Sequence, residues 1–524
     1  MVMVGGNFGV FSWGWLNLFC VFLVWGFGFT FFVFVRYLIG GEYCFLVSLC
    51  GFLGWVGLSF RRYVPFSFVV VLVLTGLVLV LPTPVGLSYD GQKALAAFVF
   101  TGLMFALQPV PLPFAGLMVP VLLVGLGLAD SAGAFNTLSR PIIILILGSL
   151  FLAEALRKHG VTRRLAQVAI ISSGGRVSRL LLSLMGIAAL LSMWMENTAT
   201  AAVLIPVALT ISNQLEDKDE ARELLMLLVL GIAYGASMGG MATVTGSASN
   251  AVASEFLSSV RVWTFLDWMM YGGLSLVLVF PVTWLALSRS MKVRVSVLDI
   301  ERTRQEYAAL GAMRGVEKEI LGVLGAAIVL WIAGSRFEDV FALPGSFLSP
   351  AVVGVIAVSY LSVRGIIEWE DVRGVSWGMF FAISAGLALG EALVRAGTTD
   401  WFTVMVAPVF EEFPFIVGLV LVVVASALLT NVVNNATVVA VFTPILIELA
   451  AGNPAFNAVA LVMPLTLATT FGYALPSASG RMALISATGY VDRGIMFRYG
   501  MLMALVGSVL LIAEFYVLWL LGWV

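Results

Sequence analysis

Two clusters of polar side chains interrupt long apolar runs, one in each half of the chain. The clustered residues are Glu196, Asn197, Thr198 and Thr200 in the run 192–209, and Thr430, Asn431, Asn434, Asn435 and Thr437 in the run 428–446. Polar side chains are costly at membrane depth, so a cluster of them there predicts a functional site. The chemistry that amides and hydroxyls offer is reversible binding. Matched interruptions in two halves of a hydrophobic chain are typical of a secondary transporter whose half-sites meet near the bilayer midplane.

The bulk composition indicates a membrane protein. Hydrophobic residues make up 61% of the 524 residues and charged residues 11%, against roughly half and a quarter in soluble domains. At about 20 residues per span, the chain has room for more than ten membrane helices. We therefore expect an all-α, integral, multi-pass protein of the cell membrane. A net charge of −1 gives no indication of a nucleic-acid partner.

Catalytic and metal-binding patterns are missing from the sequence. The three cysteines, Cys20, Cys44 and Cys50, form no CxxC or Cys/His pattern, so neither a metal site nor a disulfide framework is indicated. The only histidine, His159, lies in a basic loop, where we expect it to be solvated. There is no HExxH motif and no nucleotide-binding loop. A membrane-embedded enzyme is therefore the disfavoured alternative, and we expect no cofactor apart from a coupling ion.

The first polar cluster sits in a segment with charged residues at both ends. Residues 177–213 begin at Arg176 and Arg179 and end at the charged run 214–223. A single span would place these ends on opposite sides of the membrane, whereas a re-entrant hairpin places them on one side. Non-helical backbone at membrane depth is tolerated where it is buried or lines a cavity. We therefore expect a hairpin with Glu196-Asn197-Thr198 at its turn.

Internal echoes indicate a duplication. Glu154-Ala-Leu recurs at Glu391, and Ser247-Ala-Ser recurs at Ser477, in the same order and at nearly the same spacing from the central asparagines. The predicted organisation is as follows: extra N-terminal membrane helices over 1–88, a first repeat over 89–290, a cytoplasmic linker over 291–316 and a second repeat over 317–524. The hairpins are predicted at 177–213 and 411–451. The N-terminal helices are expected near 8–35, 41–59 and 65–82.

The distribution of basic residues predicts the orientation of the repeats. Lysine and arginine gather in short loops, which favours the cytoplasm for these loops. The basic segments are 61–62, 157–179, 289–318, Arg364 with Arg373, and Arg493 with Arg498. The second hairpin is flanked instead by Asp400, Glu411 and Glu412, so we expect it to open from the outside. The two repeats would then be inverted, which is the symmetry that alternating access requires.

Three stretches carry a resemblance to a known family: PVPLPFAGLMVPVLLVGLG, ILGSLFLAEALRKHGVTRRLA and SMWMENTATAAVLIP. In this order they resemble the divalent anion/sodium symporters, and the resemblance extends from about residue 90 to the C-terminus. It implies a homodimer in which a transport domain slides against a scaffold domain as an elevator. It also implies that each hairpin tip binds substrate carboxylates and, on its flank, sodium.

The resemblance assigns site residues position by position. Substrate binding is implied for Asn197, Thr198, Asn434, Asn435, Ser479 and Gly480. Cation binding or proton coupling is implied for Glu196, Ser192, Asn197, Gly246, Asn431, Asn435 and Ala478. Helix breaks are implied at 246–250 and 478–481. The Thr200 hydroxyl is expected to add a donor.

This sequence departs from the family pattern at several of these positions. Glu196 replaces a serine, Asn434 replaces another, and Ala436 replaces a threonine. A carboxylate at Glu196 could take up a proton, pair with Arg481 or strengthen a cation site. Arg481 could instead contact the anion or extend outward to the membrane surface. Sodium coupling, proton coupling and exchange are all left open by these changes.

The resulting hypothesis is a secondary active transporter of small divalent anions, C4-type dicarboxylates first, that works as an elevator. The alternative within the same class is sulfate or another inorganic anion. A channel is disfavoured because duplicated hairpins with a midplane site are typical of carriers.

Overall fold

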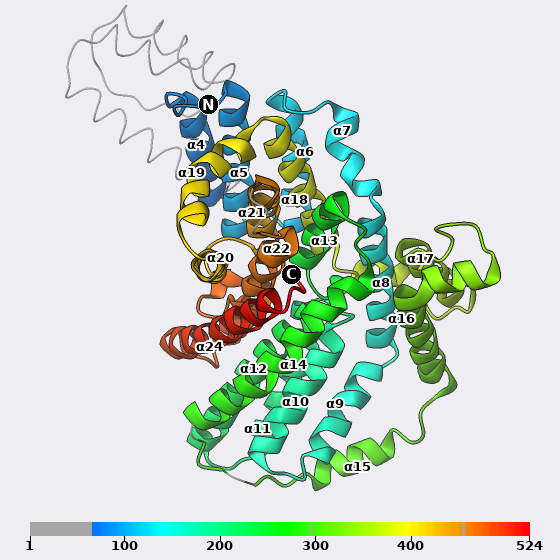
Figure 1. Cartoon of the computed structure of the whole chain (residues 1–524). Coiled ribbons are helices and arrows are strands. Elements are labelled where there is room, and N and C mark those ends of the chain that lie inside the picture. The colour runs from blue at the N-terminus through cyan, green and yellow to red at the C-terminus, as the bar shows by residue number, and fades with distance from the viewer. Residues whose placement is uncertain (1–64, 292, 296, 453–455) are drawn as a thin grey trace, which may run out of the picture. The chain divides into compact units, whose positions relative to one another are not determined.

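The computed structural model describes residues 65–291, 293–295, 297–452 and 456–524 (Figure 1). Within these residues the fold is all-helical, and the only β-type pairing is an isolated bridge between Arg176 and Val297. The third predicted N-terminal helix is α4 (Phe66–Val80). The first two, and the three cysteines, lie outside the described residues.

The helices of the first half follow the predicted order. They are α5 (Tyr89–Leu107), α6 (Leu112–Gly125), α7 (Ser131–Asn136), η1 (Thr137–Ser139), α8 (Pro141–Lys158), α9 (Val161–Ser172), α10 (Val177–Ser192), α11 (Asn197–Ser212), α12 (Lys218–Met241), η2 (Val244–Gly246), α13 (Ala248–Val260) and α14 (Phe265–Ser290). The pair α7–η1 and α8 is bent by 46°. Pro141 stands at the first position of α8, where its missing N–H costs nothing.

The second half repeats this order after the linker helix α15 (Glu301–Ala309). Its elements are α16 (Gly315–Phe341), α17 (Pro350–Val363), η3 (Trp369–Gly374), α18 (Trp377–Arg395), α19 (Thr398–Glu412), α20 (Phe415–Leu429), α21 (Asn435–Gly452), α22 (Ala458–Ala468), η4 (Thr469–Phe471), η5 (Pro476–Ala478), α23 (Gly480–Thr488) and α24 (Arg493–Leu520). In each half a short amphipathic helix, α9 or α19, precedes a helix pair and a broken helix. This order supports the predicted duplication.

The pair α10 and α11 forms a hairpin against α12. α10 runs parallel to α12, because Gly231 lies against Leu181 and Gly239 lies against Ala189. α11 runs the opposite way, because Asn197 at its start contacts the C-terminal end of α12 and a short loop joins its end to the start of α12. A Cβ atom at Gly239 would lie 2.0 Å from the Ala189 carbonyl oxygen. The glycines of α12 are therefore required for this close helix packing.

The pair α20 and α21 forms the second hairpin against α22. The Ser426 hydroxyl donates to the Leu465 carbonyl at 2.7 Å, and the Thr430 hydroxyl donates to the Thr469 carbonyl at 2.9 Å. These contacts run in the same direction along both chains, so α20 is parallel to α22. α21 packs against both α22 and α13.

Two boundaries differ from the sequence prediction. The second hairpin starts at Phe415 rather than at 411, because Pro414 keeps the preceding Phe413 out of the helical region and α19 ends at Glu412. The first helix break also lies earlier than the 246–250 expected, because it covers 242–247, between the end of α12 at Met241 and the start of α13 at Ala248. α12 stays helical to Met241, and its interior glycines pack against α10 instead of unwinding.

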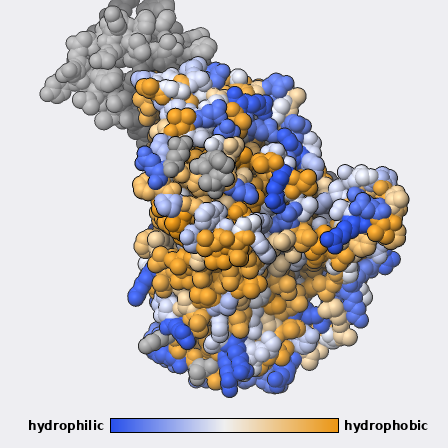
Figure 2. All heavy atoms as spheres, viewed as in Figure 1, coloured by the Kyte–Doolittle hydropathy of each residue, from blue (hydrophilic) through white to orange (hydrophobic). Residues whose placement is uncertain are grey.

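Six helices of the described chain are long and apolar enough to cross a membrane, or seven if the bent pair counts as one span. On the face shown in Figure 2, apolar side chains cover a broad area across the middle and hydrophilic side chains gather at the lower end. Large apolar side chains on α16, α17 and α24 are exposed, for example Val329, Val355 and Leu505. Such a surface suits contact with lipid.

Candidate functional site

A small cavity lies where the two hairpin tips meet the two broken helices. Its volume is about 120 Å³. The lining residues are Leu112, Glu196, Asn197, Thr198, Gly246, Ser247, Ala248, Ser376, Met379, Ala382, Asn434, Asn435, Ala436, Ala478, Ser479, Gly480 and Arg481. A larger cavity of about 520 Å³ lies among α8, α13, α14 and α16 and contains no hairpin residue. We therefore place the candidate site in the smaller one.

The two halves of the chain interlock around this cavity. α11 of the first hairpin packs against α23 of the second half, and α21 of the second hairpin packs against α13 of the first half. At the first of these contacts a Cβ atom on Gly480 would lie only 2.6 Å from Thr198 Oγ1. The cavity wall at this point therefore needs glycine.

The first half-site is a cluster of polar atoms behind the tip of α11. One atom of the Asn197 side-chain amide faces the broken helix α12–α13. This atom lies 3.1 Å from the Ala236 carbonyl oxygen and 3.2 Å from the Gly246 carbonyl oxygen. The Ser192 hydroxyl hydrogen-bonds the same amide. If the amide nitrogen faces these carbonyls, it donates to both. If the oxygen faces them, four oxygens converge, and such a cage requires a cation.

The second half-site repeats this arrangement. The Thr430 hydroxyl hydrogen-bonds the Asn435 side-chain oxygen and donates to the Thr469 carbonyl at 2.9 Å. Thr430 precedes Asn435 by the same five residues that separate Ser192 from Asn197, so the sequence carried a signal for it. The family resemblance implies Asn431 at this place, whereas the structure has Thr430 there.

Asn431 and Ser192 do not line the cavity. Asn431 is 6% exposed, donates to the Ala427 carbonyl at 2.7 Å and accepts from the Ala474 N–H at 3.0 Å. It thereby holds the hairpin tip against the broken helix. Thr200 is fully buried and away from the cavity. Asn431 therefore supports the wall of the site, and the expected Thr200 donor does not face the cavity.

Two charged side chains lie on the cavity wall. Glu196 is half-buried, and the Ser376 hydroxyl donates to its carboxylate at 3.4 Å. Arg481 is 2% exposed and donates to the Thr470 carbonyl at 3.1 Å, with its guanidinium 5.8 Å from the Tyr473 ring centre. The outward-pointing alternative for Arg481 is therefore wrong. Glu196 and Arg481 share the cavity, but no ion pair within 4.0 Å joins them.

Sequence reasoning missed the contribution of α18. Ser376 and Met379, at the start of this helix, form one wall of the cavity, although neither residue is close to a hairpin in the sequence. No polar cluster marks this stretch, so nothing in the sequence indicates that it reaches the site. His159 also differs from the prediction: it is half-buried, and its ring nitrogen hydrogen-bonds the Ile366 carbonyl at 2.9 Å.

The donor set fits a small, hard cation better than a transition metal. Among the described residues no group of three His, Cys, Asp or Glu side chains could hold a metal ion. The oxygens of Ser192, Asn197, Ala236 and Gly246, with the nearby carboxylate of Glu196, are the ligand type that such cations prefer. These residues would hold a sodium ion in the first half-site.

Comparison with known proteins now decides the family. Residues 64–523 match the family model described as the sodium:sulfate symporter transmembrane region. The chain belongs to this symporter family. The match confirms the resemblance noted in the sequence, and with the apolar helices it makes the chain an integral membrane protein.

The relatives of this chain include proteins named as transporters. A protein of Haemophilus influenzae named as an uncharacterized transporter is 27% identical over 438 residues, which are 82% of this chain and 92% of the relative. The sodium-dependent dicarboxylate transporter SdcS of Staphylococcus saprophyticus is 25% identical over 470 residues, covering 84% of this chain and 89% of SdcS.

A solved structure shares the fold of this chain. MtrF of Neisseria gonorrhoeae, described as one of a class of antimetabolite efflux pumps, aligns with a TM-score of 0.51 and 13% identity over 84% of this chain and 97% of its own. This likeness supports the architecture alone.

Proposed function

We propose that this symporter is a secondary active transporter of small divalent anions, with C4-type dicarboxylates as the first substrate class. The observation that carries the proposal is the convergence of both hairpin tips, with Asn197 and Asn435, on one cavity. The cavity volume of about 120 Å³ is well below the several hundred cubic ångströms of a pocket for a drug-sized ligand. The cavity therefore suits a small solute. The name of the SdcS relative favours dicarboxylates.

The cavity offers the anion neutral donors and one positive charge. A dianion in this cavity loses most of its water, and this loss must be offset by hydrogen bonds. Thr198, Asn434 and Ser479 supply amide and hydroxyl groups, and the N-termini of α11, α21 and α23 add backbone N–H groups with a partial positive charge. Arg481 adds a guanidinium that can contact a carboxylate directly.

Sodium is proposed as the coupling ion. The first half-site would hold it through Ser192, Asn197 and the Gly246 carbonyl, with Glu196 nearby. The second would use Thr430, Asn435 and the Thr469 carbonyl. A bound sodium ion supplies positive charge beside the substrate. Arg481 supplies one positive charge on the cavity wall, and a bound sodium ion would supply a further one against the two negative charges of a dianion.

Transport is proposed to follow an elevator mechanism in a homodimer. The hairpins and the broken helices α12–α13 and α22–α23 would move together with the cavity between them. The remaining helices, including α6, α8, α16, α17 and α18, would form the stationary scaffold. The matching order of elements in the two halves supports this division.

Proton coupling through Glu196 is the second candidate, because this carboxylate lies on the cavity wall where the related motif has serine. Sulfate is the second substrate candidate, because the family model is named for sodium:sulfate symport.

Uptake into proteoliposomes tests the proposal. Purified protein is reconstituted, and uptake of labelled succinate and sulfate is measured with an inward sodium gradient, with choline in place of sodium, and at several pH values. We expect saturable succinate uptake that disappears in choline. Sodium-independent uptake that follows a pH gradient would select proton coupling. The proposed substrate class would be wrong if neither succinate nor sulfate entered the proteoliposomes. It would also be wrong if neither anion inhibited uptake of the other.

A further inference from the structure

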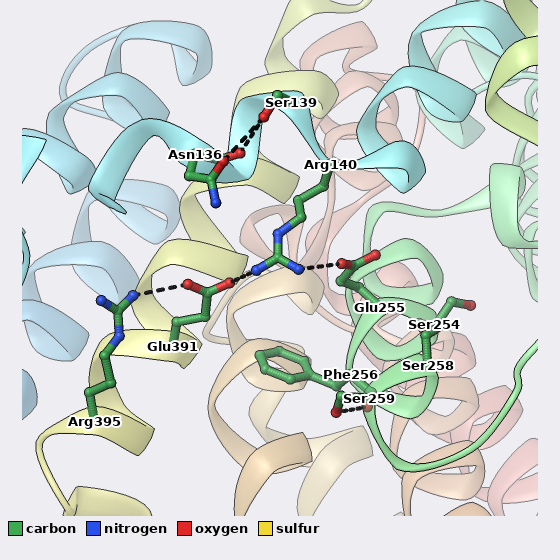
Figure 3. A network of polar contacts seen from close by, with 10 residues as sticks. All are labelled: Asn136, Ser139, Arg140, Ser254, Glu255, Phe256, Ser258, Ser259, Glu391 and Arg395. Atoms are coloured by element: carbon green, nitrogen blue, oxygen red, sulfur yellow. Dashed lines mark hydrogen bonds and ion pairs between the residues drawn. The ribbon is translucent and has the colours of Figure 1, made fainter. Parts of the chain in front are cut away.

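An ion-pair cluster joins three helices at a distance from the cavity (Figure 3). The Arg140 guanidinium contacts Glu255 at 3.1 Å through Nη1 and Glu391 at 2.6 Å through Nη2. Arg395 contacts the other oxygen of Glu391 at 3.0 Å. Arg140 caps the start of α8, Glu255 lies in α13, and Glu391 and Arg395 lie in the last two turns of α18.

The cluster contains two kinds of connection. The Arg140–Glu391 pair joins α8 to α18, and a second pair, Lys158–Asp371 at 2.7 Å, joins the other end of α8 to the η3 segment before α18. α8 and α18 are therefore fastened to each other at both ends. Glu255 links α8 and α18 to α13, because it forms an ion pair with Arg140. Because α13 begins at Ala248 on the cavity wall, the Arg140–Glu255 pair connects the scaffold to the site.

The position of the cavity indicates whether the Arg140 ion-pair cluster stabilises the inward-facing or the outward-facing state of the carrier. Leu112 and Ser376, at the N-terminal ends of α6 and α18, line the cavity. The two helices run in parallel, since Gly378 lies against Leu112 and Gly116 lies against Phe381. The cavity therefore lies near the N-terminal ends of both helices, whereas the Arg140 cluster lies at the C-terminal end of α18. Arg364 and Arg373 assign the N-terminal end of α18 to the cytoplasm.

Among the residues that the structure describes, no equivalent ion pair exists for the pseudo-symmetric helix. α23 corresponds to α13 in the second half, and its sequence GRMALISAT contains no acidic residue. Its only charge, Arg481, faces the cavity. Two inverted repeats alone would make the inward and outward states similar in energy. A charge pair that forms on one side only removes this equivalence.

We propose that the Arg140–Glu255 ion pair is a latch that favours the inward-facing state of the carrier and must break in each transport cycle. This inference rests on the proposed elevator mechanism. As α13 moves outward with the hairpins, Glu255 leaves the reach of Arg140, while the Arg140–Glu391 pair stays within the scaffold. Both side chains are partly exposed, at 38% and 21%, so the pair is weak enough to break. Its loss shifts the two states by about fivefold, which is typical of a partly exposed pair.

Distance measurement between α13 and α18 tests the latch. Spin labels are placed on cysteines at Val260 and Val394, which are about half exposed, in a variant whose three native cysteines are replaced by serine. Labelled protein is diluted into unlabelled protein, so that distances within one protomer dominate. We expect a main short distance and a minor longer one in the parent protein. Glu255→Gln should enlarge the longer population about fivefold, and Glu255→Asp, shorter by one methylene, should give an intermediate increase.

The matched control is Arg395→Gln, which breaks a pair to Glu391 within α18 and leaves α13 untouched. It should leave the distance distribution unchanged. An unchanged distribution in both Glu255 variants, or an equal change in the control, would overturn the latch. Succinate uptake by the same preparations keeps the two proposals separate. Uptake without any effect of Glu255 on the distances refutes the latch alone, whereas a shifted distribution without uptake refutes only the proposed substrate.

Discussion

Replacing Gly480 with alanine perturbs the contact between the two halves of the cavity at a single point. The new Cβ would lie 2.6 Å from Thr198 Oγ1 and 3.2 Å from Thr198 Cγ2, whereas ordinary contacts are about 3.5–4.0 Å. Thr198 is β-branched and cannot easily rotate away, so α23 and α11 must separate by roughly 0.5–1 Å. Overpacking of this kind costs about 1–3 kcal/mol. If this energy comes out of substrate binding, affinity falls roughly five- to hundredfold.

The assay is equilibrium binding of labelled succinate to purified protein in the presence of sodium. Gly273→Ala is the control, because Gly273 lies in α14 and a Cβ atom there meets nothing within 4 Å. The control should bind as the parent does. Parent-like affinity in a folded Gly480→Ala variant would refute the inference that the contact between α11 and α23 sets the geometry of the site.

Three further predictions concern single residues. Glu196→Gln should raise the sodium concentration for half-maximal uptake about tenfold, since it removes a charge beside the first half-site; a flattened pH profile with unchanged sodium dependence would assign Glu196 to proton coupling instead. Arg481→Gln should raise the KM for succinate by about tenfold or more, as expected for a lost charge-assisted hydrogen bond, and an unchanged KM would remove Arg481 from the site. Gly239→Ala should destabilise the protein by about 1–3 kcal/mol because its Cβ would overlap the Ala189 carbonyl; an unchanged melting temperature in detergent would contradict the tight packing of α10 on α12.

Much of the architecture could be predicted because membrane helices and polar interruptions leave strong signals in sequence. The apolar runs and their charged flanks predicted a helix at 65–82 and hairpins at 177–213 and 411–451, and the structure has α4 at Phe66–Val80 and helix pairs over 177–212 and 415–452. The matched asparagines, Asn197 and Asn435, predicted that distant segments share one site, and the structure places both on one cavity. Inverted repeats make this possible, because equal spacing in the two halves implies equivalent positions in space.

The contacts across the interior could not be predicted in the same way. Glu154 and Glu391 occupy equivalent positions in the two halves of the sequence, yet their partners differ: Glu154 pairs with Arg157 in its own helix, and Glu391 pairs with Arg140 from another. Ser376 reaches the cavity only because α18 packs between the hairpins and α6. Such contacts depend on how helices pack, which the spacing of residues within one helix does not record.

Substrate binding by single-tip variants tests the central claim most directly. Succinate affinity is measured for the parent protein, for Asn197→Ala and for Asn435→Ala, each checked for a folded, monodisperse state. Because both tips line one cavity, each substitution alone should reduce affinity at least tenfold, as expected when a buried polar group loses its partner. Full affinity in either folded variant would show that the two hairpins do not form a joint site.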